Sequence, residues 1–332
     1  MGAYHRLVTV FLVAPQEFKG SLTAGEAARA IAAGVRDAAP GAETVLAPMS
    51  DGGAGLVDAL LAARGGERET TAAHDPLMRP VAARWALLPG GTAAVEMAAA
   101  SGLVLLTDDE RDPLVATTYG TGELVRAALD RGCGEIIVGV GGSATVDGGA
   151  GALQALGARL LDATGEEVAP GGAALARMAR IDLSGVDRRL GSTRLRVASD
   201  VTNRLCGPGG AAAVFGPQKG ASAADVAALD GALAHFAAVV ARELGIDLLS
   251  LAGGGAAGGL AAGLRVLGAT VEPGFGLVAA AVGLEALVAR ADIVVTGEGR
   301  LDAQTSYGKT ASGVAAMARA HGKRVLAVAG SI

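Results

Sequence analysis

The sequence has few of the residues that mark disulfide-stabilised or zinc-binding proteins. Only two cysteines occur among 332 residues, Cys133 and Cys206, and neither lies in a paired motif or beside a histidine. A zinc site or a disulfide framework is therefore not expected, and the composition fits a cytoplasmic, reducing location. The apolar run at residues 7–14 passes directly into Pro15 and charged residues, without the cleavage site of a signal peptide, so we interpret it as a first strand.

Basic stripes and long hydrophobic spans are also lacking in the sequence. The net charge is −5 and Lys and Arg form no cluster, so we expect neither nucleic acid nor an anionic membrane as a partner. The longest uncharged stretch, residues 248–264, is too short to cross a bilayer and contains six glycines. Its spacing of small residues predicts close packing of a helix inside a soluble core.

Glycine, by contrast, is abundant. The chain has 52 Gly but only 11 Pro, and 51% of its residues are hydrophobic. Without a three-residue repeat this composition excludes a collagen, and the apolar content excludes a disordered chain. The length is sufficient for two domains with sizeable cores.

The order of apolar runs and helical patterns predicts an α/β fold. Near the N-terminus, Thr23 and Glu26 have the spacing of a capping box, which predicts that a helix starts at Thr23. Strands and helices alternate at both chain ends, as in a parallel sheet, whereas the middle has shorter apolar runs. We therefore expect the ends to join in one domain, the middle to form a second, and the site to lie in the cleft between them. The expected segments are strands at 43–47, 81–88, 92–97, 135–140, 195–199, 293–296 and 325–329 and helices at 56–63, 153–156, 222–244 and 311–321.

Lysine is rare, and its positions single out three loops. Only four lysines occur among 28 basic residues, and Lys19, Lys219 and Lys309 each lie beside a glycine. A compact ammonium next to exposed backbone N–H groups suits phosphate or carboxylate binding. A solvated loop lysine is an equal alternative for each one, but three together favour a function.

The densest glycine pattern follows the strand expected at 135–140. Residues 139–151 are rich in Gly, which lets the backbone approach an anion, and a helix is expected directly after them. This pattern predicts a phosphate cradle. A dinucleotide fingerprint starting at Gly139, with Asp162 further on, is the alternative. Asp147 and the two glycines after it would interrupt the helix that such a fingerprint needs.

Acidic residues stand beside Gly or at expected strand ends. Phosphoryl transfer from ATP needs carboxylates for magnesium, cations near the moving phosphoryl group and a group that orients the attacking hydroxyl. The inventory suits a kinase, although each acid alone is equally well explained as a turn or cap residue. The acids in question are Asp51, Asp147, Asp200, Glu298 and Asp302.

These motifs resemble those of the bacterial type I glycerate kinase family, the glycerate 2-kinases, along essentially the whole chain. So many motifs in the same order make the resemblance highly specific. The matching segments are 14–15, 18–22, 50–53, 96–98, 117–122, 141–151, 199–203, 215–220, 254–259 and 296–302.

The resemblance implies a two-domain α/β enzyme. A Rossmann-like (flavodoxin-like) domain would be built from residues 1–66 and 291–332, and a second α/β domain, residues 67–290, would be inserted between them. The implied reaction transfers the γ-phosphoryl group of ATP to D-glycerate, giving 2-phospho-D-glycerate and ADP, with Mg²⁺ as the metal. The sequence does not decide between a monomer and a homodimer.

The resemblance and the loop patterns together nominate site residues. Lys19, Asp200 and Asp302 are the expected catalytic residues, and Asp200 ranks first as general base and as magnesium ligand. The expected substrate-binding residues are Ser21, Asp51, Asn203, Glu298 and Arg300. The expected ATP-binding residues are Gly141, Gly142, Ser143, Thr145, Asp147, Gly148 and Lys219.

Several positions depart from the family pattern. Gln16 and Glu17 stand where Asp and Ser are usual, Ala54 where an acid is usual and Val146 where Asn is common, and Glu17 is a candidate to restore one charge. Because carboxylates are lost at these positions, an alternative stays open. The chain could be a homologue that binds a ligand without turnover, or one that phosphorylates another acceptor. The alternative hypothesis of a nicotinamide-dependent oxidoreductase is supported by the glycine fingerprint alone. Family members usually continue past the last strand, so a further covering segment is expected after residue 332.

Overall fold

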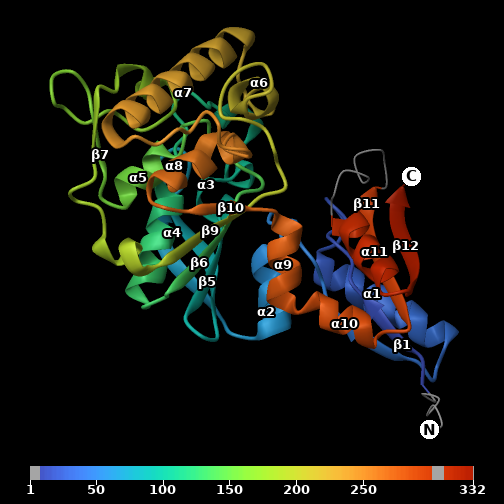
Figure 1. Cartoon of the computed structure of the whole chain (residues 1–332). Coiled ribbons are helices and arrows are strands. Elements are labelled where there is room, and N and C mark those ends of the chain that lie inside the picture. The colour runs from blue at the N-terminus through green and yellow to red at the C-terminus, as the bar shows by residue number, and fades with distance from the viewer. Residues whose placement is uncertain (1–7, 301–309, 332) are drawn as a thin grey trace. The chain divides into compact units, whose positions relative to one another are not determined.

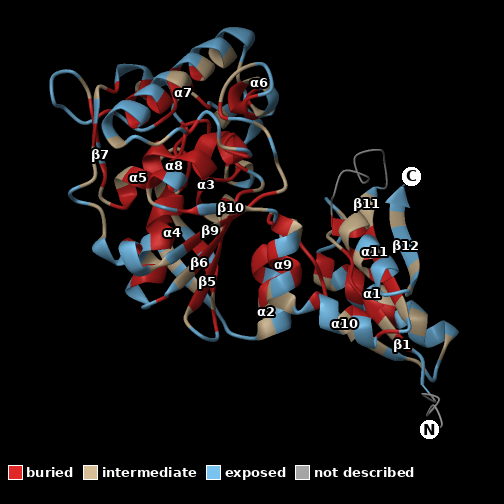
Figure 2. Ribbon diagram, in the orientation of Figure 1, coloured by how far each residue is buried: buried red, intermediate tan, exposed pale blue. Residues whose placement is uncertain are grey.

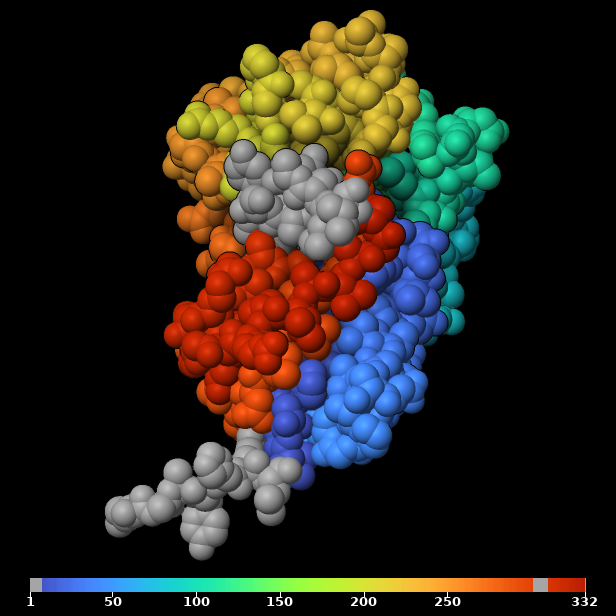
Figure 3. Space-filling view, turned by 90° about the vertical axis from the view of Figure 1, so that its right-hand side faces the viewer, coloured from blue at the N-terminus to red at the C-terminus, as the bar shows by residue number. Residues whose placement is uncertain are grey.

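The computed structural model describes residues 8–300 and 310–331, and its chain divides into two compact units. Unit 1 combines both chain ends, Met1–Gly65 and Pro273–Ile332, and unit 2 is Gly66–Glu272 (Figure 1). Both units mix helices and strands, which confirms the predicted α/β class. Figure 3 shows the blue N-terminal segment beside the red C-terminal segment on the surface of unit 1.

The second boundary differs from the expected one. The sequence predicted that the inserted domain ends at residue 290, whereas unit 2 ends at Glu272. The reason is that α9 (Gly274–Val282) packs against α2 (Leu56–Arg64) of unit 1, and α10 (Leu284–Arg290) leads from α9 into the last strands of the same unit.

Unit 1 contains one parallel sheet with the strand order β12-β11-β1-β2. Helix α1 (Ala24–Ala38) connects β1 to β2, and α11 (Thr310–Ala320) precedes β12. The chain thus moves across the sheet in one direction from β1 and in the other from β11, so the topological switch point lies between these two strands. The strands are β1 (Val10–Val13), β2 (Glu43–Leu46), β11 (Ile293–Arg300) and β12 (Arg324–Ser331).

The start of α1 is specified locally by the sequence. The Thr23 Oγ1 atom accepts a hydrogen bond from the Glu26 N–H at 3.3 Å, and Glu26 Oε2 accepts one from the Thr23 N–H at 2.9 Å. This reciprocal capping box confirms the predicted helix start. The helix then buries Ala28 and Ala32 against the sheet, which forms the small core of unit 1.

Unit 2 is built on a six-stranded mixed sheet with the order β10-β9-β6-β5-β4-β3. Its edge strand β3 was not predicted, because all of its residues are polar or alanine and carry no strand-like apolar pattern. The strands are β3 (Glu67–His74), β4 (Pro80–Leu88), β5 (Thr92–Glu96), β6 (Glu135–Gly139), β9 (Arg194–Ala198) and β10 (Thr270–Glu272), and a separate pair is β7 (Arg159–Leu161) with β8 (Arg180–Asp182). The helices are α3 (Ala98–Ser101), α4 (Tyr119–Asp130), α5 (Ala150–Ala155), α6 (Ala211–Phe215), α7 (Ala223–Leu244) and α8 (Leu260–Val266).

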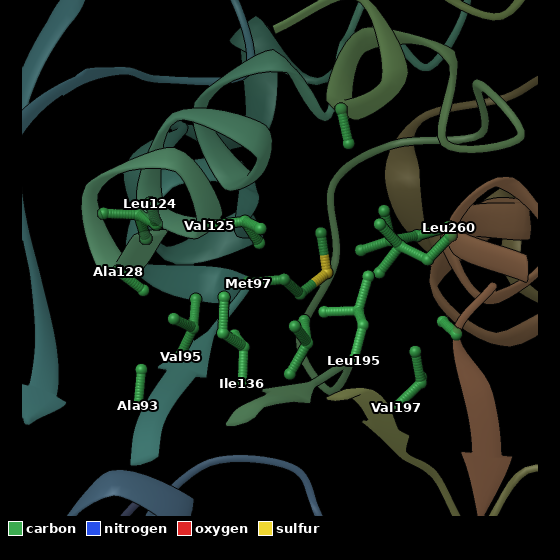
Figure 4. Packing of buried hydrophobic residues seen from close by; sticks show 14 of the residues in the cluster. Ala93, Val95, Met97, Leu124, Val125, Ala128, Ile136, Leu195, Val197 and Leu260 are labelled. Atoms are coloured by element: carbon green, nitrogen blue, oxygen red, sulfur yellow. The ribbon is translucent and has the colours of Figure 1, made fainter. Parts of the chain in front are cut away.

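The central strands of unit 2 are covered on both faces. Ile136, Ile137 and Val138 follow one another in β6 and are all at most 1% exposed, although alternate residues of a strand point to opposite faces. Figure 2 shows the central strands of this sheet largely in the colour of buried residues. Figure 4 shows Leu124 and Val125 of α4 among the side chains of the core cluster. The carboxyl edge of this sheet is therefore held by a well-packed core.

Helix α7 is the one helix within residues 8–300 and 310–331 that is long and apolar enough to cross a membrane. Its Leu233, Phe236 and Val240 side chains are fully buried in the second core cluster of unit 2. These side chains of the helix therefore belong to the core of the unit.

The start of α9 fixes the loop after β2. A Cβ atom at Gly274 would lie 1.8 Å from the carbonyl oxygen of Asp51, far inside van der Waals contact. Glycine is therefore required at this position so that α9 can rest on the loop that carries Asp51.

We expect Gly274→Ala to lower the free energy of unfolding by about 2 kcal/mol or more, because the added methyl group must displace backbone. Gly276→Ala is the matched control in the same helix, since its Cβ would meet only a Pro273 side-chain atom at 3.9 Å. Alanine at position 276 should raise stability by up to about 1 kcal/mol through helix propensity. Equal effects of the two substitutions in chemical denaturation would contradict the proposed close contact.

Candidate active site

The glycine-rich loop of unit 2 runs from the end of β6 to the start of α5. Gly141 and Gly142 reach solvent, whereas residues 143–148 are buried. Helix α5 begins only at Ala150, after Gly149 in a left-handed conformation with φ 80°. The sequence predicted that no helix starts within the glycine fingerprint, and the structure agrees with this prediction. In a dinucleotide-binding turn the helix would start inside the fingerprint, so the arrangement here is different.

A second glycine-rich segment packs directly against this loop. A Cβ atom at Gly258 would lie 1.9 Å from the Thr145 carbonyl oxygen, and one at Gly263 would lie 2.4 Å from the Gly148 carbonyl oxygen. The Gly148 N–H also donates a hydrogen bond to the Gly258 oxygen at 2.9 Å. The uncharged stretch at 248–264 thus packs closely in the core, as its composition predicted.

Asp147 is fully buried and joins the starts of two helices. Its Oδ2 atom accepts hydrogen bonds from the N–H and hydroxyl of Thr118, both at 2.8 Å, and from the Gly151 N–H at 3.2 Å. Its Oδ1 atom accepts the Gly149 N–H at 3.0 Å. Thr118 precedes α4 and Gly151 lies in the first turn of α5, so the carboxylate lies at the positive ends of both helices. The sequence nominated Asp147 for ATP, but both of its oxygens are engaged inside the protein.

Lys219 lies inside unit 2 rather than at its surface. Its Nζ atom donates hydrogen bonds to Ser143 Oγ and to the Thr145 carbonyl oxygen, both at 2.7 Å, and the residue is 1% exposed. Burial lowers the pKa of Lys219 to about 7, although the neighbouring Asp147 charge acts in the opposite direction. The sequence nominated Lys219 for ATP binding, but its flexible side chain turns inward to acceptors of the glycine-rich loop.

Asp200 and Asn203 follow β9, the neighbour of β6. Gly139 and Ala198 are paired in the parallel register, so Asp200 and the glycine-rich loop leave the same edge of the sheet. Asp200 is half-buried, and the Asn203 amide donates a hydrogen bond to the Gly209 carbonyl oxygen at 2.8 Å. The structure thus brings Asp200 to the loop edge and uses the Asn203 side chain to hold its own loop.

In unit 1, Lys19 stands on a tight turn after β1. The Phe18 N–H donates to the Leu22 carbonyl oxygen and the Ser21 N–H to the Phe18 carbonyl oxygen, both at 2.8 Å. Lys19 and Ser21 are exposed at the tip of the turn. A Cβ atom at Gly299 of β11 would lie 3.1 Å from the Lys19 nitrogen, so the turn rests on β11.

Acidic groups gather near the same turn. Asp51 Oδ1 accepts the Gly53 N–H at 3.0 Å, which holds the loop after β2. Burial and the Asp51 charge raise the pKa of Glu17, and Lys19 partly offsets them. Glu298 of β11 is half-buried and Arg300 is exposed. The nominated residue Asp302 and the loop lysine Lys309 lie outside the described residues.

The described residues contain no group of three or more His, Cys, Asp or Glu side chains arranged to hold a metal ion. Magnesium that accompanies a nucleotide is bound mainly by phosphate oxygens and water, with one or two protein carboxylates. Asp200 at the edge of unit 2 supplies a carboxylate of this kind, so its chemistry fits such an ion.

Sequence reasoning missed the role of Thr118. Its hydroxyl donates to Asp147 and also accepts the Ala152 N–H at 3.0 Å, so it connects α4, α5 and the loop between β6 and α5. The segment at 117–122 was noted only as a matching motif. This segment has several Thr and Gly residues just before a helical pattern in the sequence. Such small residues are the signal that could have indicated a close contact with another helix.

Comparisons with known proteins identify relatives of this chain. A family model described as "Glycerate kinase family" matches residues 11–332. The chain is 50% identical to a glycerate kinase of Bacillus subtilis (strain 168) and 47% identical to a glycerate 2-kinase of Escherichia coli (strain K12), each over 97% of this chain and 85% of that protein. A crystal structure of a "putative glycerate kinase 2" from Salmonella typhimurium LT2 matches with a TM-score of 0.90 at 48% identity, over 98% of this chain and 87% of that one.

We expect Asp147→Asn to reduce the free energy of unfolding by about 3 kcal/mol or more, because an amide cannot accept all the hydrogen bonds and leaves buried Lys219 without its counter-charge. Asp162→Asn is the control. Asp162 also accepts the Thr164 N–H, at 2.8 Å, but is only partly buried, so its loss should change stability by about 1 kcal/mol at most. Similar losses for both variants in urea denaturation would rule out a special role for the buried carboxylate.

The buried lysine predicts a pH dependence of stability. The pKa of Lys219 is about 7 in the folded chain and has the ordinary value of 10.5 when unfolded, so the unfolded chain binds more protons between these values. The free energy of unfolding of the wild-type protein should therefore rise between pH 7 and pH 10 relative to that of Lys219→Met, by at most about 1.4 kcal/mol per pH unit. A constant difference between the two proteins over this range would show that Lys219 keeps its proton.

Proposed function

The chain belongs to the glycerate kinase family, and we propose that it transfers the γ-phosphoryl group of ATP to D-glycerate, giving 2-phospho-D-glycerate and ADP. The observation that carries this proposal is the match over nearly the whole chain, 97%, to relatives named glycerate kinase and glycerate 2-kinase. The two cysteines are free thiols, which agrees with a reducing, cytoplasmic location. D-glycerate and ATP are the proposed small-molecule partners.

The glycine-rich loop of unit 2 is the proposed binding site for the phosphates of ATP. Gly141 and Gly142 offer backbone N–H groups at the surface, where no side chain blocks the approach of an anion. Ser143 and Thr145 are tied from behind by the buried Lys219 ammonium. Lys219, Asp147 and Gly148 then act as the support of this loop and do not touch the nucleotide.

Asp200 is the proposed acidic residue of unit 2 in the reaction. It is placed at the end of a strand next to the glycine-rich loop and would either hold Mg²⁺ or accept the proton of the attacking hydroxyl. When bound, Mg²⁺ neutralises charge that develops on the phosphate oxygens. Asp302 remains the second nominee for the base.

The exposed turn of unit 1 is the proposed site for the acid substrate. Lys19 projects from a turn that β11 supports, and Ser21 offers a hydroxyl beside it. An ammonium of this kind binds a carboxylate or a phosphoryl oxygen. Asp51, Glu298 and Arg300 complete the polar residues proposed for this edge of the sheet.

A coupled ADP-release assay with Mg-ATP and D-glycerate tests the proposed function, and phosphorus NMR of the product should show 2-phosphoglycerate. We expect Lys19→Ala to lower kcat/KM roughly 30-fold, which corresponds to about 2 kcal/mol of lost charge-assisted binding. Lys323→Ala is the control. Lys323 lies directly before β12, at the opposite edge of the sheet from Lys19, and its ammonium donates a hydrogen bond to the Ala289 carbonyl oxygen. If Lys19→Ala leaves kcat/KM unchanged, Lys19 does not belong to the site. If the folded wild-type protein shows no turnover, the proposed function is refuted.

A further inference from the structure

Two residues just beyond β1 and in β11 lie opposite each other at the switch point of unit 1. The strands pair in parallel with Val13 opposite Val295. The same register continues past β1, because the Ala14 N–H donates to the Val295 carbonyl oxygen at 2.7 Å and the Gln16 N–H donates to the Gly297 carbonyl oxygen at 2.8 Å. Gln16 is therefore the register partner of Glu298.

Register partners in a parallel sheet project from the same face, about 5 Å apart. The Oε1 atoms of Gln16 and Glu298 are both buried, and neither accepts a hydrogen bond from any residue in the described part of the chain. Buried acceptors without a donor are rare in folded proteins. Two of them on paired positions indicate a ligand that supplies donors.

The neighbours in the same row cannot satisfy these acceptors with their side chains. On one side the Met49 N–H donates to the Pro15 carbonyl oxygen at 2.9 Å, which extends the β1–β2 register and places Met49 next to Gln16. On the other side Ala329 of β12 is the register partner of Glu298. The polar pair is thus flanked by an apolar side chain at each end.

We propose that Gln16 and Glu298 recognise the 3-hydroxyl group of the acid substrate and thereby set its specificity. This inference rests on the proposed function. The one proton of a hydroxyl can be shared by an amide oxygen and a carboxylate oxygen in a three-centre hydrogen bond. The crevice at a switch point is where α/β sheets bind ligands. The 2-hydroxyl must stay available to accept the phosphoryl group, so the 3-hydroxyl is the group left for this pair. Lys19, on the turn that rests on Gly299, then takes the substrate carboxylate.

Hydroxyl-deletion analogues test the assignment by titration calorimetry in the presence of Mg²⁺ and a non-hydrolysable ATP analogue. D-Lactate lacks the 3-hydroxyl and 3-hydroxypropionate lacks the 2-hydroxyl. We expect Gln16→Leu and Glu298→Leu, which each remove the acceptor oxygen, to weaken the binding of D-glycerate and 3-hydroxypropionate roughly 10-fold or more. The binding of D-lactate should stay within about twofold. Equal weakening of all three acids, or a loss confined to D-lactate, would overturn the inference.

Stability of the ligand-free protein separates recognition from a structural role. Gln16→Leu removes an acceptor that has no described donor, so the midpoint of thermal unfolding should stay the same or rise. Gln154→Leu is the control, since the Gln154 amide donates to the Val168 carbonyl oxygen at 3.1 Å and its loss should lower the midpoint without changing the discrimination. A lowered midpoint for Gln16→Leu with unchanged discrimination would assign the pair to the fold.

Two further outcomes keep this inference distinct from the proposed function. Wild-type turnover of D-glycerate combined with unchanged discrimination in both variants overturns the hydroxyl assignment alone, whereas a wild-type protein that neither binds nor phosphorylates D-glycerate overturns both. Mg²⁺ binding to the nucleotide-free protein that Glu298→Gln abolishes would also overturn the assignment, because the pair would then be a cation site.

Discussion

The buried carboxylate of Asp147 is the interaction on which the proposed nucleotide half of the molecule depends. A fully buried charge is tolerated only when hydrogen bonds and a counter-charge replace water. Asp147 has both, because N–H groups at the starts of α4 and α5 donate to it and the Lys219 ammonium lies nearby. Lys219 in turn donates hydrogen bonds to Ser143 and Thr145. The buried side chains of Asp147 and Lys219 therefore support the loop segment that ends at the solvent-accessible Gly141 and Gly142.

The abundance of glycine follows from how closely these loops approach one another. Cβ atoms at Gly151 and Gly258 would lie 2.0 Å from Thr117 Oγ1 and 1.9 Å from the Thr145 oxygen, so any side chain would separate the helices from the loop. The low content of aromatic residues, 3% of the chain, agrees with this close backbone packing. Segments rich in Ala and Gly contact one another through their backbones rather than through large side chains. Close backbone contact makes the loop shape depend on helix packing as well as on its own sequence.

Local signals in the sequence predicted the elements well, and non-local contacts account for what it could not predict. The capping box at Thr23 specifies α1 by itself, and the apolar run of β6 needs no partner to be recognised. The unit boundary at residue 272 depends instead on Gly274 meeting Asp51, more than 200 residues away in the sequence. Likewise, nothing near Lys219 in the sequence indicates that its side chain turns inward, because its acceptors lie in another loop. Residue type and glycine neighbours drew attention to these loops, but they do not indicate which side chains face solvent.

The departures at positions 16 and 17 have different consequences in three dimensions. Gln16 pairs with Glu298 across the switch point, so an amide stands where the family pattern has a carboxylate, and the pair carries one acidic group instead of two. Glu17 is the next residue along the chain, after the end of β1. Burial and the charge of Asp51 raise the pKa of Glu17, and the charge of Lys19 acts in the opposite direction. Glu17 remains a candidate to restore one charge in the loop after β1. The lower negative charge of the pair makes the site less attractive to a cation and leaves it suited to a neutral hydroxyl donor.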